Sequence, residues 1–190
     1  SGKRINSAKD DAAGLAIATR MDANVRGLNQ AVRNANDGIS LSQTAEGAMG
    51  NISNILVRMR ELAVQSANGT NGATDRTAIQ TEVAALVSQI DDIANRTTFN
   101  GTALLTGGAT AGDPVTIAIQ TGLETGQTVA IEIDDLRAEA LGVHDGTDPI
   151  DLSTTAGASA ALAALDAAIQ TVATQRANLG AQQNRLEATV

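Results

Sequence analysis

Residues 45–63, AEGAMGNISNILVRMRELA, decide the fold of this 190-residue chain. Apolar side chains recur in this stretch at steps of three and four residues, at Ala45, Met49, Ile52, Leu56, Met59 and Ala63. Heptad spacing of this kind keeps one stripe of a helix, its seam, facing a partner helix. The stretch therefore predicts a long helix that packs lengthwise against another helix.

The same spacing extends toward the N-terminus, so the predicted helix covers about residues 11–68. The earlier seam positions are Ala18, Met21, Val25, Leu28, Val32, Ala35 and Ile39, and the phase slips near Ser42. Ser7-Ala8-Lys9-Asp10 has the spacing of a capping box at the start of the helix. Asn68-Gly69 signals its end.

Glycines inside this segment oppose the prediction of a helix. They are Gly14, Gly27, Gly38, Gly47 and Gly50. Each costs about 1 kcal/mol relative to alanine in a helix interior. Local signals alone favour a break at Asn36-Asp37-Gly38. If the helix is continuous, packing against neighbours must hold it, and the glycines mark close approach of another part of the chain.

Two further helices are predicted, over about residues 74–97 and from about residue 155 to the end. The seam of the helix at 74–97 consists of Ile79, Val83, Leu86, Ile90 and Ile93. The seam of the C-terminal helix consists of Leu162, Leu165, Ile169, Val172, Leu179, Leu186 and Val190, and Arg176 and Gln183 occupy its two polar positions. Alternating residues around 115–119 and 129–133 predict a β-hairpin with one buried face, and an acidic loop follows at 144–155. The expected fold is mainly α: an elongated antiparallel coiled-coil-like bundle of two N-terminal helices and one C-terminal helix, with a small β-hairpin region.

Composition excludes several classes of function. The chain has no Cys, one His (His144) and one aromatic residue (Phe99), which excludes disulfide scaffolds, cysteine nucleophiles and two-histidine zinc sites. No catalytic, cofactor-binding or metal-binding set can be assembled, so we predict no enzyme activity and no cofactor. The formal net charge of −8 argues against nucleic acid as a partner. No apolar run approaches 18 residues, so we predict no membrane insertion.

The acidic loop offers only a weak candidate for a cation-binding site. Asp145, Asp148 and Asp151 lack the residue spacing of a calcium-binding loop. We expect His144 to lie exposed among these acidic residues rather than to act as a ligand.

Several longer strings carry a resemblance to a known family. They are residues 4–14 (RINSAKDDAAG), 33–40 (RNANDGIS), 60–68 (RELAVQSAN), 98–101 (TFNG) and 179–185 (LGAQQNR). Over most of residues 3–105 and 158–190 the chain resembles bacterial flagellin, the subunit of the flagellar filament. Residues 106–157 match only in outline, as a hairpin region.

The resemblance implies one rod domain with a helix that continues through Gly38. Residues 1–97 would supply its two N-terminal helices, 98–157 the β-hairpin region and 158–190 the returning helix, with no large outer domain. Because the chain starts without Met and stops inside a helical pattern, we expect a fragment that lacks both terminal segments of the family. The implied partners are other flagellin subunits, an export chaperone and the type III export apparatus. The implied location is the extracellular flagellum, reached without a cleavable signal peptide, and the implied role is self-assembly for motility.

The resemblance also implies recognition of the free monomer by Toll-like receptor 5. The family's recognition residues fall on Arg58, Leu62 and Glu82, with Gln65 nearby. The spacing of Arg58, Leu62 and Gln65 is i, i+4, i+7, so we expect one exposed ridge beside the seam. The competing interpretation is an ordinary solvated arginine and a half-buried leucine, and Val57 stands where the family usually has glutamine.

Alternatives stay open beside the filament subunit. One is a flagellar hook–filament junction protein, and another is a cell-surface flagellin paralogue that binds a polysaccharide. The string at residues 60–68 favours the filament subunit. A cytoplasmic signalling bundle shares the alanine-rich heptads but would lack the hairpin.

Overall fold

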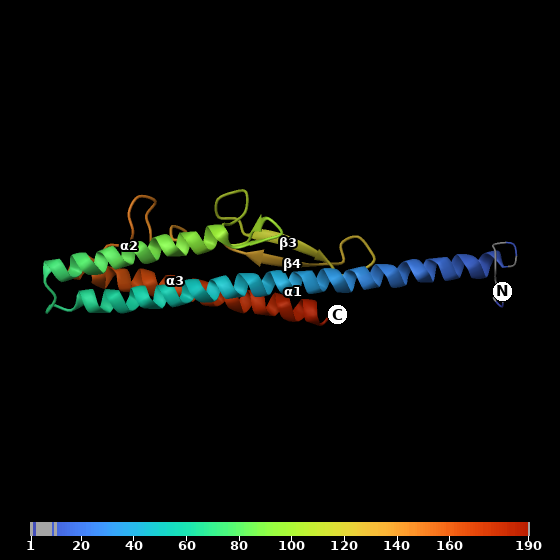
Figure 1. Ribbon diagram of the computed structural model, residues 1–190, viewed down its shortest axis with the longest axis horizontal. Coiled ribbons are helices and arrows are strands. Elements are labelled where there is room, and N and C mark those ends of the chain that lie inside the picture. Colours follow the sequence, from blue (N-terminus) through green and yellow to red (C-terminus); the bar gives the residue numbers. More distant parts are fainter. Residues whose placement is uncertain (1, 3–8, 10, 190) are drawn as a thin grey trace.

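The protein is an elongated, mainly helical rod (Figure 1). The computed structural model describes residues 2, 9 and 11–189. In chain order the elements are α1 (Ala12–Ala67), α2 (Ala73–Arg96), β1 (Thr98–Phe99), β2 (Thr102–Ala103), β3 (Val115–Gln120), β4 (Thr128–Ile133) and α3 (Thr155–Glu187). The predicted fold class and the three predicted helices are confirmed, with ends that agree to within about two residues except at the C-terminus.

The predicted capping box at the start of α1 is not tested by the structure. Most of that box, including Ser7 and Asp10, lies outside the described residues. Among the described residues Asp11 is the N-cap, and its Oδ1 accepts a hydrogen bond from the backbone N–H of Gly14 at 2.8 Å. The cap satisfies one of the backbone donors that a helix leaves free at its start.

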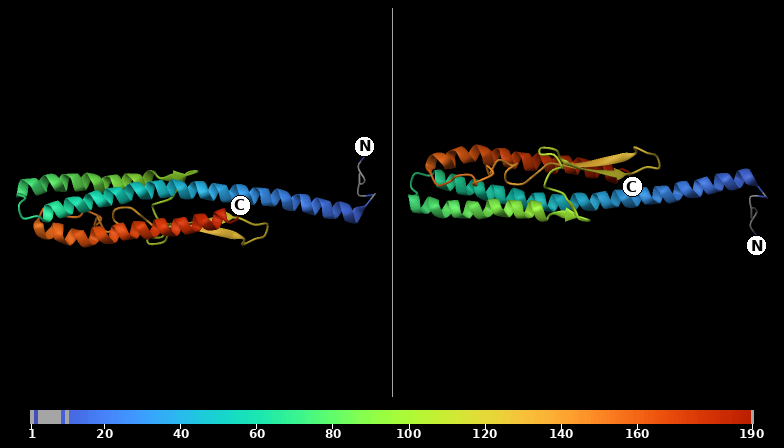
Figure 2. Two further views of the ribbon diagram at one scale, coloured as in Figure 1. Left: turned by 90° about the horizontal axis from the view of Figure 1, so that it is seen from below. Right: turned by 90° about the horizontal axis from the view of Figure 1, so that it is seen from above.

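Helix α1 is the axis of the rod, and α2 and α3 lie along its flanks (Figure 2). Both flanking helices run antiparallel to α1, and they make little direct contact with each other. The space between them is filled by the segment from residue 134 to residue 153. Its buried side chains are Leu136, Ala138, Leu141, Val143 and Leu152. The sequence prediction of a plain acidic loop at 144–155 was therefore incomplete, because the segment also supplies part of the core.

The second half of the α1 seam is buried as predicted. Ala45, Met49, Ile52, Leu56, Met59 and Ala63 are all inaccessible to solvent. Helix α3 covers this face with Leu165, Val172, Leu179 and Leu186, which are also buried. Arg60 pairs with Asp166 and Arg176 pairs with Glu46, each at 2.6 Å, so two ion pairs border the α1–α3 contact. Val190, the last predicted seam residue, lies outside the described residues.

The first part of the predicted seam is exposed. Met21 is 61% exposed, Val25 55% and Leu28 51%, and Ile17 beside them is 50% exposed. Helix α3 ends at Glu187, and its Leu186 lies against Gly38 of α1. Residues 12–34, which we call the arm, therefore extend past α3 (Figure 1). Within the described residues, no helix covers the seam of the arm.

The helix break favoured by local signals at Asn36-Asp37-Gly38 was also wrong, because α1 is continuous. A Cβ at Gly38 would lie 2.9 Å from Leu186 Cδ1 and 3.0 Å from Ile119 Cγ1. The glycine thus permits close approach of α3 and of the hairpin, and that packing offsets its low helix propensity. Gly27 has a similar role beneath Leu123, whereas a Cβ at Gly47 or Gly50 would meet nothing within 4 Å.

The predicted hairpin is confirmed as β3 paired antiparallel with β4, with Ile117 opposite Ile131. Ile131 and Ile133 are fully buried, so one face of the hairpin covers the core. The hairpin also braces the arm, because Asn34 Nδ2 donates a hydrogen bond to the carbonyl of Gln120 at 3.0 Å. A second, short hairpin of β1 and β2 turns through Asn100 and Gly101, which have φ values of 49° and 78°.

One described helix, α3, is long and apolar enough to cross a membrane by length and composition alone. The mean hydropathy of its qualifying window is 1.3, and 28% of that window is buried. Alanines account for much of the apolar content, whereas the larger residues Leu165 and Val172 are buried in the core. The absence of membrane insertion stays a prediction.

Candidate functional site

The four residues singled out in the sequence line one groove between α1 and α2. Arg58, Leu62 and Gln65 come from α1, and Glu82 comes from α2. The groove has a volume of about 340 Å³ and also receives Asp75, Ala78 and Ile79 from α2. The structure thus brings the four residues, from two helices, to one surface.

An ion pair joins the two charged members of the set across the groove. Arg58 Nε donates a hydrogen bond to Glu82 Oε1 at 3.0 Å, and its Nη1 donates to Glu61 Oε2 at 3.1 Å. The hydrogen bond to Glu82 and then that to Glu61 raise the pKa of the Arg58 guanidinium above its usual value. The paired side chains are 49% and 45% exposed, so solvent screens the attraction and leaves them available to a partner.

Leu62 departs from the predicted ridge. It is only 2% exposed and lies in the floor of the groove with Ile79, which is 6% exposed. The reason is that α2 packs against this flank of α1, so the row of residues at 58, 62 and 65 borders the α1–α2 contact. Of the four residues, Arg58, Gln65 and Glu82 are exposed and form a rim of the groove.

Arg76 organises the turn at the end of the groove, and the sequence analysis missed it. Its Nε donates to the carbonyl of Ser66 at 2.9 Å, its Nη1 to Asn71 at 2.8 Å and its Nη2 to Asn68 at 3.0 Å. These carbonyls lie in the last turn of α1 and in the turn that follows, where backbone acceptors lack helical partners. The three carbonyls lie before Arg76 in the chain and meet it only through the turn, so no local pattern in the sequence reveals this role.

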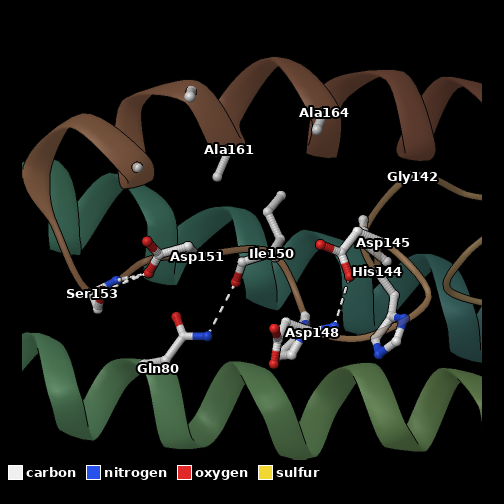
Figure 3. Close-up of a pocket in the computed structure, with 14 residues that line it drawn as sticks. Gln80, Gly142, His144, Asp145, Asp148, Ile150, Asp151, Ser153, Ala161 and Ala164 are labelled. Atoms are coloured by element: carbon white, nitrogen blue, oxygen red, sulfur yellow. Dashed lines mark hydrogen bonds between the residues drawn. The ribbon is translucent and has the colours of Figure 1, made fainter.

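A second groove of about 770 Å³ lies between α2, α3 and residues 142–153 (Figure 3). Small residues of α3, among them Ala161 and Ala164, form one wall, and the acidic segment forms the other. Gln80 of α2 holds this segment, because its Nε2 donates to the carbonyl of Ile150 at 3.2 Å and its Oε1 accepts from the N–H of Leu152 at 2.6 Å.

The acidic residues of this groove hold the local backbone. Asp145 Oδ1 accepts from the N–H groups of Thr147 and Asp148 at 2.8 and 2.7 Å, and these bonds lower the pKa of Asp145 below its usual value. The Ser153 hydroxyl and N–H likewise lower the pKa of Asp151.

His144 is half-buried rather than exposed as predicted, and its Nδ1 accepts from the N–H of Gly146 at 2.9 Å. Across the described ranges, no three His, Asp or Glu side chains converge on a possible metal position.

Comparisons with known proteins agree with this architecture. The family model described as "Bacterial flagellin N-terminal helical region" matches residues 1–110. The flagellin of Bacillus subtilis strain 168 is 45% identical over 215 aligned positions, which cover all of this chain and 71% of the relative.

Two solved structures share the fold. The crystal structure of Bacillus cereus flagellin is 39% identical, with a TM-score of 0.68 over 82% of this chain and 85% of that one. A flagellar hook-associated protein of Vibrio parahaemolyticus is 17% identical, with a TM-score of 0.75 over 96% of this chain and 92% of that one. At this low identity the second comparison shows a shared fold alone.

Proposed function

The chain belongs to the bacterial flagellin family, and from that premise we propose that it is a structural subunit of the extracellular flagellar filament. The proposal rests on the length of α1, which has 56 residues and is roughly 85 Å long. Helices α2 and α3 pack along it, so the whole domain is a rod. A rod of this shape has a large surface for its volume, which suits side-by-side packing of identical copies. Its chemistry is packing rather than catalysis, in keeping with relatives that are structural proteins.

We assign three parts to one rod domain: residues 1–97, 98–157 and 158–190, with no large outer domain inserted between α2 and α3. Contacts that join parts of the chain far apart in sequence support this assignment. Ser66 Oγ of α1 donates to the carbonyl of Leu152 at 2.6 Å, and Arg176 of α3 pairs with Glu46 of α1. We further propose that an export chaperone and the type III export apparatus handle the chain before it folds.

A chimera tests the filament role. Residues 1–190 replace the matching region of the Bacillus subtilis flagellin, in a strain that lacks its own flagellin. We expect filaments in electron micrographs and swimming on soft agar. A matched chimera with Leu179→Asp, which places a charge in the buried α1–α3 contact, should form none. Stable, exported chimera that never forms filaments would contradict the proposal.

We propose recognition of the free monomer by Toll-like receptor 5 as a second function. The specific observation in its favour is that Arg58, Gln65 and Glu82 form one exposed rim above Leu62. Because the Arg58–Glu82 pair is solvent-exposed and screened by water, its removal should leave the fold intact and the surface testable.

A reporter-cell assay on the purified chain tests this role. We expect Arg58→Ala and Glu82→Ala to weaken signalling at least roughly tenfold, because the loss of a charged side chain at an interface often lowers affinity by that much. Arg60→Ala is the matched control, because Arg60 is an equally exposed arginine that pairs with Asp166 on the other flank of α1. Unchanged signalling by both groove variants would rule out this surface. Leu62→Ala is a poor test, because Leu62 is buried and its loss would disturb the fold.

The alternatives receive less support. The hook-associated protein shares the fold at 17% identity, so the fold does not discriminate the junction role, whereas 45% identity to a flagellin favours the filament subunit. Binding of a polysaccharide usually uses exposed aromatic rings, and the single aromatic residue, Phe99, is half-buried against the core.

A further inference from the structure

The chain contains three Asn-Gly pairs, Asn68-Gly69, Asn71-Gly72 and Asn100-Gly101, and each lies in a connection between two helices or two strands. The backbone nitrogen that follows an asparagine can attack Cγ of the side-chain amide. Glycine favours this reaction, because it has no Cβ to obstruct the approach. The three pairs therefore share one intrinsic reactivity, and the fold decides how much of it each pair expresses.

Hydrogen bonds hold Asn71-Gly72 away from this reaction. The backbone nitrogen of Gly72, which would attack, donates a hydrogen bond to Asp75 Oδ2 at 2.9 Å where α2 begins. The amide of Asn71 is also held, because its Nδ2 donates to the carbonyl of Gln65. Both reacting groups must therefore lose a partner before they can meet, and each lost hydrogen bond raises the barrier.

Hydrogen bonds also restrain Asn68-Gly69, although fewer of them involve the reacting atoms. Asn68 Oδ1 accepts from the backbone N–H of Thr70 at 3.3 Å, as asparagine side chains commonly do in turns. The carbonyl of Asn68 accepts from Arg76 Nη2 at 3.0 Å. The side chain and the backbone of this asparagine are therefore both tied to the turn after α1.

Asn100-Gly101 lacks such restraints and forms the tip of the β1–β2 hairpin. Both residues are exposed, and within the described chain neither the Asn100 side chain nor the Gly101 N–H makes a hydrogen bond. The φ of Asn100 is 49°, which is uncommon for a residue with a Cβ. The hairpin has only two residue pairs, so its tip can open at little cost while Leu104 and Leu105 stay buried.

We propose that Asn100 is a site of spontaneous modification, at which the folded chain deamidates without an enzyme. The Gly101 nitrogen loses its proton and bonds to Asn100 Cγ, the amide nitrogen leaves as ammonia, and a five-membered succinimide ring remains. Water then opens the ring at one of its two carbonyls. Cleavage of the bond to Cγ gives aspartate, and cleavage of the bond to the main-chain carbonyl gives isoaspartate.

The two products differ in their effect on the hairpin. Aspartate tolerates a positive φ as asparagine does, so it retains the turn and adds one negative charge. Isoaspartate adds the same charge and also lengthens the backbone by one carbon. This insertion would disturb the pairing of Phe99 with Thr102 next to the turn.

Peptide mapping by mass spectrometry tests the site. The purified chain is held in mildly alkaline buffer at body temperature for several weeks, and trypsin then releases residues 61–76 and 97–137. Asn100 is the only asparagine of the second peptide, and fragmentation separates Asn68 from Asn71 in the first. We expect Asn100 to deamidate roughly tenfold faster than Asn71, because two hydrogen bonds oppose attack at Asn71. Equal rates at the two sites would overturn the proposal.

Unfolding provides the control that separates the fold from the sequence. In guanidinium chloride the hydrogen bonds of the turns are lost, so the three asparagines should react at similar rates. A ranking that survives unfolding would show that neighbouring residues in the sequence, and not the turns, set the reactivity, and it would also overturn the proposal.

A matched variant tests the protection at Asn71 directly. Asp75→Ala removes the acceptor of the Gly72 N–H, so it should accelerate deamidation of Asn71 severalfold and leave the rate at Asn100 unchanged. Circular dichroism checks that the helices are retained. An unchanged rate at Asn71 in the folded variant would contradict the structural ranking of the sites.

Discussion

The two halves of α1 have the same sequence pattern and opposite surroundings. Between Ala45 and Ala63 every seam residue is inaccessible to solvent, because α2 and α3 cover the helix. In the arm, Met21 and Leu28 occupy equivalent positions and are more than half exposed. The comparison shows that heptad spacing encodes a face that needs a partner, without encoding whether that partner belongs to the same chain.

Matched methionine truncations should show the largest difference between the halves. Met59→Ala removes a fully buried side chain and should lower the free energy of unfolding by about 2–5 kcal/mol. Met21→Ala removes one that is 61% exposed and should change it by less than about 0.5 kcal/mol. Urea unfolding followed by circular dichroism measures both. Equal losses would mean that the arm is covered in the free chain.

Two glycine substitutions should change stability in opposite directions. Gly38→Ala places a Cβ against Leu186 and Ile119 and should destabilise the fold by about 1–3 kcal/mol through overpacking. Gly47→Ala meets open space on the helix surface and should stabilise it by about 0.5–1 kcal/mol. Thermal unfolding of the two variants provides the check. A stabilising Gly38→Ala would show that α3 and the hairpin can move away from α1.

Removal of the Arg76 side chain probes the end of α1 that lies farthest from the arm. Arg76→Met keeps the apolar stem but loses three hydrogen bonds to the carbonyls of Ser66, Asn68 and Asn71. We expect a loss of about 1–2 kcal/mol, because these acceptors become available only to water. Amide hydrogen exchange should also accelerate at the end of α1 while the arm stays unchanged. Arg26→Met in the arm is the matched control, and an equal loss there would contradict the explanation.

Acid should have the smallest effect, confined to the loop between α2 and α3. The pKa values of Asp145 and Asp151 are lowered in the folded chain, so their contribution to stability is present above the ordinary carboxyl pKa of about 4. It is lost as pH falls through the lowered values, because protonation weakens the hydrogen bonds they accept. Asp145→Asn should therefore flatten the acid side of the stability curve, measured by urea unfolding between pH 5 and about pH 2. An unchanged slope would show that these bonds do not hold the loop.

Much of the fold was predictable because it follows from periodicity. The spacing at Ile79 and Val83 predicted α2, and alternation at Ile131 and Ile133 predicted the hairpin. The break at Gly38 was predicted wrongly because the residues that compensate for the glycine, Leu186 and Ile119, lie far away in sequence. Local propensity cannot register such contacts.

The sequence indicated which residues lie together at the site, but not which of them are exposed and which are buried. Helical spacing placed Arg58 and Leu62 in one row along α1. Whether the residues of such a row are exposed or buried depends on how closely the next helix packs against it. The same limit applied to the segment before α3. Its acidic residues suggested a solvated loop, whereas Val143 and Leu152 are buried between the helices. A short irregular segment has no period that would reveal its buried side chains.

The covering of α1 by α3 has a consequence for the order of folding. Contacts of Arg58 with Glu82 span 24 residues, whereas those of Glu46 with Arg176 span 130. Contacts between residues close in sequence close smaller loops and form faster. The α1–α2 pair can therefore assemble before α3 packs against α1. Until α3 arrives, Met49 and Leu56 lack their cover, and the half-formed rod is prone to aggregation. Helix α3 therefore shields apolar side chains that the earlier α1–α2 pair leaves exposed.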